Sequence, residues 1–178
     1  MVDSLQEHFN TDIFLMGLNS VSDGICEDNG RSYIDFDKFK EPDYCCDITK
    51  GMQSLSSVDS ILVHKENKHL ILVEFKDMDS IGDFSDIKKW IKDKDCSVKI
   101  KIPDSILLLG YFLKEKGYTF DEFMELDKSF FYVYKSSSFK SQINNHLKYR
   151  FSKYNFMLKN IKTIETQSYI KFLEKESL

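Results

Sequence analysis

Two short segments near the middle of the chain are rich in apolar residues. Residues 57–63 are Ser-Val-Asp-Ser-Ile-Leu-Val, and residues 70–76 are Leu-Ile-Leu-Val-Glu-Phe-Lys. The polar residues 64–69 between them fit a short turn, so the pattern predicts a hairpin of two paired strands. The unbroken apolar run at residues 70–73 is typical of a strand that is covered on both faces.

Helical spacing marks the segments on either side of this hairpin. Leu5, Phe9, Ile13 and Met16 fall on one side of a helix predicted for residues 3–19. The other predicted elements are helices at residues 82–94, 119–126, 138–152 and 164–175, and strands at residues 33–36, 51–56 and 130–134.

Residues 98–102, Val-Lys-Ile-Lys-Ile, alternate between apolar and basic side chains. Such alternation is typical of a strand, and Pro103 would end it. Asp104 can then cap a further helix over residues 105–116, which ends at Gly117. The pattern therefore predicts a strand between two separate helices.

The composition is that of one folded domain. The chain has 178 residues, 42% of them hydrophobic and 14% aromatic, with only 7 Gly and 2 Pro. This is enough for a real core and argues against a disordered chain. We expect a single domain over residues 1–178, with an acidic variable segment at 20–50 and a basic aromatic segment at 128–164.

No apolar run is long enough to span a bilayer, and the N-terminus lacks the basic-then-apolar pattern of a secretion signal. We therefore expect a cytoplasmic protein without a membrane partner. Cys26, Cys45, Cys46 and Cys96 show no Cys-x-x-Cys spacing. A zinc site is not indicated, and free buried thiols are expected.

The predicted hairpin carries three charged side chains. Glu74 and Lys76 point to the same face of their strand because strand side chains alternate. If the strands pair, Asp59 comes back beside them, so that two carboxylates and an ammonium converge at one end of a sheet. The alternative is that Asp59 caps a turn and Glu74 and Lys76 form an ordinary ion pair. The apolar run before Glu74 disfavours that alternative, because a charge at the end of a buried strand needs partners.

This Asp59 with Glu74-x-Lys76 on an apolar strand resembles the PD-(D/E)xK nuclease superfamily, which includes restriction endonucleases and Holliday-junction resolvases. The motif covers residues 52–77, and Val58 stands where the family pattern has proline. The resemblance implies an α/β (α+β) fold. Its expected centre is a restriction-endonuclease-like αβββαβ core, with a mixed sheet flanked by helices.

The resemblance also implies a function. The chain would be a metal-dependent nuclease that hydrolyses phosphodiester bonds in DNA, ahead of RNA, in phage defence, mobile elements or repair. Asp59, Glu74 and the backbone carbonyl of Phe75 would bind Mg2+ or Mn2+, which prefer oxygen ligands. Lys76 would position the attacking water. A homodimer or a subunit of a larger complex is compatible with this interpretation.

Two further groups are candidates for the site. The first core helix of the family often adds an acid, and Asp12 lies on the apolar stripe of the predicted helix 3–19. Alternatively, Asp12 stabilises the first turn of a new helical segment. On the helix after the motif, Lys88 and Lys89 could assist at the phosphate, as a basic residue does in some family members, although solvated lysines are the simpler interpretation.

The formal net charge of −4 hides a basic segment. Residues 128–164 contain eight Lys and Arg and no Asp or Glu. Cations give affinity for phosphates and aromatic rings can stack on bases, so Lys148, Arg150 and Lys153 are candidate nucleic-acid contacts. The alternative is a solvated basic face over a buried helical stripe made of Phe139, Ile143, Leu147 and Phe151.

Two other functions stay open at this point. One is a nuclease-like fold without activity that binds nucleic acid or a partner protein. The intact Asp59, Glu74 and Lys76 argue against it. The other is a small acidic interaction or inhibitor protein with a different fold, in which the three residues would scatter.

Overall fold

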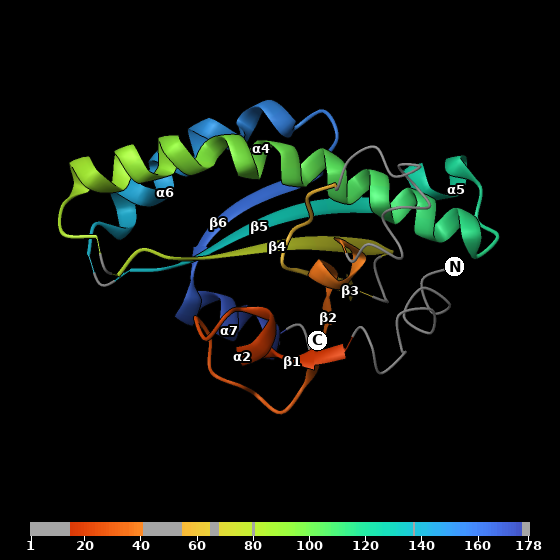
Figure 1. Cartoon of the computed structure of the whole chain (residues 1–178), viewed down its shortest axis with the longest axis horizontal. Helices are drawn as coiled ribbons and strands as arrows, with labels where there is room; N and C mark the ends of the chain where they lie inside the picture. Colours follow the sequence, from red (N-terminus) through yellow and green to blue (C-terminus); the bar gives the residue numbers. More distant parts are fainter. Residues whose placement is uncertain (1–14, 41–54, 65–67, 80, 137, 176–178) are drawn as a thin grey trace.

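A computed structural model describes residues 15–40, 55–64, 68–79, 81–136 and 138–175. The fold is α+β, as expected, and helices flank a mixed sheet (Figure 1). The strands are β1 (Leu15–Gly17), β2 (Ser32–Asp35), β3 (Ser60–His64), β4 (His69–Asp77), β5 (Asp127–Lys135) and β6 (Asn160–Glu165). The helices are α2 (Leu18–Val21), η1 (Phe36–Lys40), α4 (Phe84–Glu115), α5 (Phe120–Met124), α6 (Lys140–Phe151), η2 (Ser152–Tyr154) and α7 (Thr166–Lys175).

The described strands form one sheet in the order of the chain, β1-β2-β3-β4-β5-β6. The pairs β1–β2, β2–β3 and β3–β4 are antiparallel, whereas β4–β5 and β5–β6 are parallel. A parallel connection needs a long crossover, and α4 with α5 supplies it between β4 and β5. The predicted hairpin is confirmed, with β3 and β4 paired from Ser60 opposite Val73 to His64 opposite His69.

β4 is buried on both faces, as its apolar run predicts. Leu70 and Leu72 belong to the core beneath α4 and α6, and Ile71 and Val73 belong to a second core against α2 and α7. Figure 1 shows these two helical layers on opposite sides of the sheet. Phe75 faces the second core. Its neighbours Glu74 and Lys76 therefore lie on the opposite face of the sheet, which α4 covers.

The prediction of a strand at residues 98–102 is wrong, because these residues lie inside α4, a single helix of 32 residues. Val98 and Ile102 are four residues apart and both are buried on the sheet side, while Ile100 is 53% exposed. One side of a helix is therefore apolar here. The helices predicted for residues 82–94 and 105–116 are therefore parts of one helix. Pro103 lies in the interior of α4.

The helix tolerates Pro103 through a contact with another element. A proline has no N–H, so it cannot donate to the carbonyl four residues earlier, that of Lys99. The hydroxyl of Tyr154 donates to this Lys99 carbonyl instead, at 3.0 Å. The contact replaces the missing helical hydrogen bond and ties η2 to the turn of α4 that carries Lys101.

The predictions for the outer parts of the chain are confirmed in some elements and wrong in one. The strands expected at residues 33–36 and 130–134 are found as β2 and β5, and the helices at 119–126, 138–152 and 164–175 as α5, α6 and α7. The helix expected at 164–175 begins two residues later than predicted, because residues 164 and 165 belong to β6. The predicted helix 3–19 is wrong at residues 15–17, which form β1, and its earlier residues lie outside the described part.

The remaining expectations concern one strand, the membrane and the cysteines. The predicted strand 51–56 is not formed at residues 55–56, and residues 51–54 are outside the described part. Within the described ranges, no helix has the length and apolar character needed to cross a membrane. Cys26 is a buried free thiol, as expected, and burial raises its pKa to about 11. Cys45 and Cys46 lie outside the described residues, as does the side chain of Cys96.

We predict that Tyr154→Phe lowers the free energy of unfolding by about 1 kcal/mol, because the hydrogen bond from the Tyr154 hydroxyl to the Lys99 carbonyl is lost. In a Pro103→Ala background the loss should be smaller, since the substituted alanine can donate its own N–H to that carbonyl. Urea denaturation of the four proteins of this double-mutant cycle measures the difference. Tyr111→Phe, at an exposed tyrosine of α4, is the control. Equal losses in both backgrounds would contradict the proposed replacement bond.

Candidate active site

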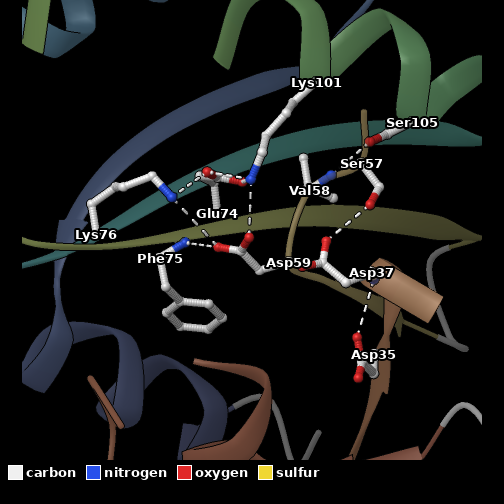
Figure 2. A network of polar contacts seen from close by, with 10 residues as sticks. All are labelled: Asp35, Asp37, Ser57, Val58, Asp59, Glu74, Phe75, Lys76, Lys101 and Ser105. Carbon is white, nitrogen blue, oxygen red and sulfur yellow. Dashed lines mark hydrogen bonds and ion pairs between the residues drawn. The ribbon is translucent and has the colours of Figure 1, made fainter. Parts of the chain in front are cut away.

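Four charged side chains meet where β3 begins and β4 ends (Figure 2). Asp59 immediately precedes β3, Glu74 and Lys76 lie on β4, and Lys101 reaches them from α4. The structure therefore brings together the three residues that the motif singled out. It adds a second lysine that the sequence analysis did not identify.

Asp59 is oriented by the main chain of β4. Its Oδ2 accepts a hydrogen bond of 2.7 Å from the N–H of Phe75, while its own carbonyl accepts one of 3.1 Å from the N–H of Phe36. The Phe75 ring packs on the other face of the sheet, edge-on against Tyr169 at a centroid distance of 5.6 Å. The donor that holds Asp59 thus belongs to a residue whose side chain is fixed in the second core.

The segment before Asp59 is held by α4. The N–H of Ser56 donates to Asp104 Oδ2 and the N–H of Val58 donates to Ser105 Oγ, both at 2.9 Å. Ser105 is completely buried. The expected role of Asp104 as a helix cap is wrong, because α4 continues through it. One turn of α4 instead accepts the hydrogen bonds of the chain that leads into β3.

Lys101 lies between the two carboxylates. Its Nζ is 3.1 Å from Asp59 Oδ1, 2.7 Å from Glu74 Oε1 and 2.8 Å from Glu74 Oε2. Lys76 forms an ion pair with Glu74 Oε1 on the other side, and its Nζ is 3.9 Å from Asp59 Oδ2. Two ammonium groups therefore balance two carboxylates, and the four formal charges sum to zero.

The ion pairs of this cluster are strengthened because their side chains are largely buried. The Glu74 side chain is 0% exposed, whereas those of Asp59, Lys76 and Lys101 are 18%, 22% and 16% exposed. Burial and then the nearby Asp59 charge raise the pKa of Glu74, and Lys76 and Lys101 oppose this rise. Burial alone would lower the pKa of Lys101, but the attraction of Glu74 and Asp59 outweighs it and the pKa is raised. Lys101 is therefore a cation at neutral pH.

The donor set fits a hard divalent ion. Three carboxylate oxygens, one from Asp59 and two from Glu74, already surround a single point at 3.1 Å or less. The N–H and C=O of a strand residue point to the same side, so the Phe75 carbonyl also lies on the Asp59 side of β4. No group of three or more His, Cys, Asp or Glu side chains suited to a metal occurs in the described ranges. Mg2+ commonly uses one or two carboxylates completed by substrate phosphates and water.

The other candidates are placed as follows. Asp12 lies outside the described residues. Lys88 and Lys89 are exposed in the first half of α4, and Lys88 Nζ lies 4.8 Å from the centroid of the Phe84 ring. A lysine from α4 does reach the site, but it is Lys101, more than three turns beyond Lys89 along the helix.

The basic segment is only partly a free cationic face. Lys128 is buried and donates to the carbonyls of Phe123 and Leu126 at 2.7 and 2.9 Å. Lys140 and Lys159 form ion pairs with acidic residues of the neighbouring strands.

The three residues of this segment proposed to contact nucleic acid lie at the end of α6 and in η2. Lys148 and Lys153 are exposed, and Lys153 Nζ lies 5.1 Å from the centroid of the Tyr154 ring. Arg150 belongs to α6, but its side chain is outside the described part. Through Tyr154, this region adjoins the turn of α4 that carries Lys101.

Lys101 was missed because its segment was interpreted as a strand. A signal for the helix was present, since Ile87, Ile91, Val98 and Ile102 keep helical spacing up to Pro103. Taken as one helix, this pattern places Lys101 beside Val98 and Ile102, close to the sheet.

Comparison of the chain with protein-family models, with curated proteins and with solved structures finds no significant match to any of them. The functional assignment is therefore inferred from the geometry of the four charged residues and of the sheet that carries them.

We predict that Ser105→Ala lowers the free energy of unfolding by about 1–3 kcal/mol, because the buried N–H of Val58 loses its acceptor. It should also weaken any function of Asp59, whose position depends on this segment. Chemical denaturation and the activity assay below measure the two effects. The control is Ser168→Ala, at an exposed position of α7. Unchanged stability would show that Ser105 does not hold the segment.

Proposed function

We propose that the chain is a Mg2+- or Mn2+-dependent nuclease that hydrolyses phosphodiester bonds in DNA. The observation that carries this proposal is the convergence of Asp59 and Glu74 on one cation position, with Lys76 beside them. Residues about 15 positions apart in the chain meet at the end of a sheet strand, in a partly exposed site. This is the donor chemistry that phosphodiester hydrolysis by a hard metal ion requires.

The sheet around the site supports a restriction-endonuclease-like core. β2, β3 and β4 form an antiparallel unit, α4 follows, and β5 returns parallel to β4. This agrees with the βββαβ part of the expected αβββαβ order. In this arrangement Asp59 comes at the start of the middle strand, and Glu74 and Lys76 come towards the end of the third.

The residues of the site would have two roles, metal binding and positioning of the attacking water. A bound divalent ion supplies Lewis acidity toward the phosphate and lowers the pKa of a coordinated water. Asp59, Glu74 and the Phe75 carbonyl would hold it. Lys76 would orient the attacking water and offset the negative charge that develops on the phosphate. Its ion pair with Glu74 keeps the ammonium at the edge of the carboxylate pair.

We expect Lys76→Ala to lower cleavage by about a hundredfold or more while the protein stays folded, because water positioning is lost. The assay uses circular single-stranded DNA, plasmid and RNA, each with and without Mn2+. Lys114→Ala, at an exposed lysine of α4, is the matched control and should retain full activity. Undiminished cleavage by the Lys76→Ala protein would remove the proposed role.

Asp59→Asn should weaken Mn2+ binding by about tenfold or more, since an amide oxygen is a poorer ligand than a carboxylate for a hard cation. Isothermal titration calorimetry measures the affinity without any substrate. Asp93→Asn, at an exposed aspartate of α4, should bind Mn2+ like the unsubstituted protein. Equal affinities for all three proteins would speak against Asp59 as a ligand.

One observation favours a second candidate function, that of a nuclease-like fold without activity which binds nucleic acid or a partner protein. The two lysines already neutralise Asp59 and Glu74 without a metal ion. The same assay separates the two functions. Binding of DNA or RNA without Mn2+-dependent cleavage of any of the three substrates would favour the second.

A further inference from the structure

The ammonium of Lys101 stands where the proposed metal ion would be bound. All three carboxylate oxygens that form the cation position contact its Nζ, at 2.7 to 3.1 Å. A divalent ion would need the same oxygens, at about 2.0–2.1 Å in the case of Mg2+. The oxygens cannot coordinate both cations at these distances, so the ion and the Lys101 ammonium compete for one position.

Lys101 and Lys76 are not equivalent in this competition. Lys76 extends from β4 and contacts Glu74 Oε1, with Asp59 Oδ2 at 3.9 Å, so it lies at one side of the carboxylate pair. Lys101 comes from the helix that covers the sheet and is within hydrogen-bond distance of both carboxylates (Figure 2). Among the described residues, only the Lys101 ammonium occupies the point on which the oxygens of both acids converge.

Lys101 can leave without disturbing the fold of α4. Its side chain is 16% exposed, so part of it already contacts solvent. The lysine stem is long and flexible, and its charge can be presented at several points. The backbone of this turn is held independently, through the Tyr154 bond to the Lys99 carbonyl and through the buried Val98 and Ile102.

We propose that Lys101 is an internal counter-ion that keeps the cation position closed until a nucleic-acid phosphate is present, and that the phosphate then receives its ammonium. This inference rests on the proposed nuclease function. The incoming metal would displace Lys101 from Asp59 and Glu74, and an adjacent phosphate oxygen would offer the ammonium a new partner. Metal and nucleic acid would then strengthen each other's binding by the same factor, as linkage requires.

The test is Mn2+ titration of the protein without nucleic acid. Lys101→Met removes the competing charge and should tighten Mn2+ binding by about tenfold or more. Lys92→Met, at an exposed lysine of the same helix, should leave the affinity unchanged. If Lys101 served only to arrange the two carboxylates, its removal would instead weaken Mn2+ binding, so the sign of the change decides.

Two further variants keep the test decisive if Lys101→Met does not fold. Lys101→Gln should tighten Mn2+ binding as Met does, whereas Lys101→Arg retains the charge and should leave it weak. The rise in melting temperature at saturating Mn2+ should be larger for Met and Gln than for the unsubstituted protein, because tighter binding to the folded state stabilises it more. Equal rises for Gln and Arg would overturn the proposal.

The phosphate step is measured in the Lys76→Ala protein, in which cleavage is suppressed. A single-stranded DNA oligonucleotide should tighten Mn2+ binding there, and should do so less when Lys101→Met is added. The same degree of tightening in both proteins would overturn the transfer of Lys101 to the phosphate.

The outcomes also separate this inference from the proposed function. Equal Mn2+ affinity with and without Lys101, together with loss of binding in Asp59→Asn, would overturn the inference and leave the nuclease assignment standing. Failure of Mn2+ to bind the unsubstituted, Lys101→Met and Lys101→Gln proteins would overturn both. Binding by the Met or Gln protein alone would support a position that Lys101 closes.

Discussion

The neutralisation of one buried carboxylate organises this molecule. Glu74 is fully buried on a strand in the middle of the sheet, and an unpaired charge there would be very costly. Its neighbours come from three directions: Lys76 from its own strand, Lys101 from the covering helix, and Asp59, which shares both lysines, from the start of the neighbouring strand. The crossing of α4 over the end of β4 is therefore as much an electrostatic requirement as a packing one.

The part of the site that could be predicted is the part that is local in the chain. The hairpin follows from its apolar runs, and strand alternation then determines that Glu74 and Lys76 share a face and that Asp59 returns beside them. Lys101 could not be found in this way, because it comes from another layer of the fold. Its segment also alternates like a strand and is followed by Pro103. The helical spacing of the apolar residues competes with this strand-like signal, and the contacts with the sheet below and with Tyr154 favour the helix.

The basic segment, residues 128–164, is a second example of contacts that the sequence alone does not reveal. The charge pattern alone suggested that this segment could contact nucleic acid. The structure buries Lys128 as a donor to two carbonyls and pairs Lys140 and Lys159 with acids from neighbouring strands. A count of like charges along the chain does not reveal such pairs, because the partners are brought in by strand pairing and helix packing.

The contact between Phe75 and Tyr169 has a consequence for variation in this protein. The N–H of Phe75 orients Asp59 on one side of the sheet, while its ring is clamped by Tyr169 on the other. The direction of an acidic side chain is thus set partly by aromatic packing in a core that contains none of the charged cluster. Amino-acid changes in that remote core can consequently tune the chemistry while leaving every charged group in place.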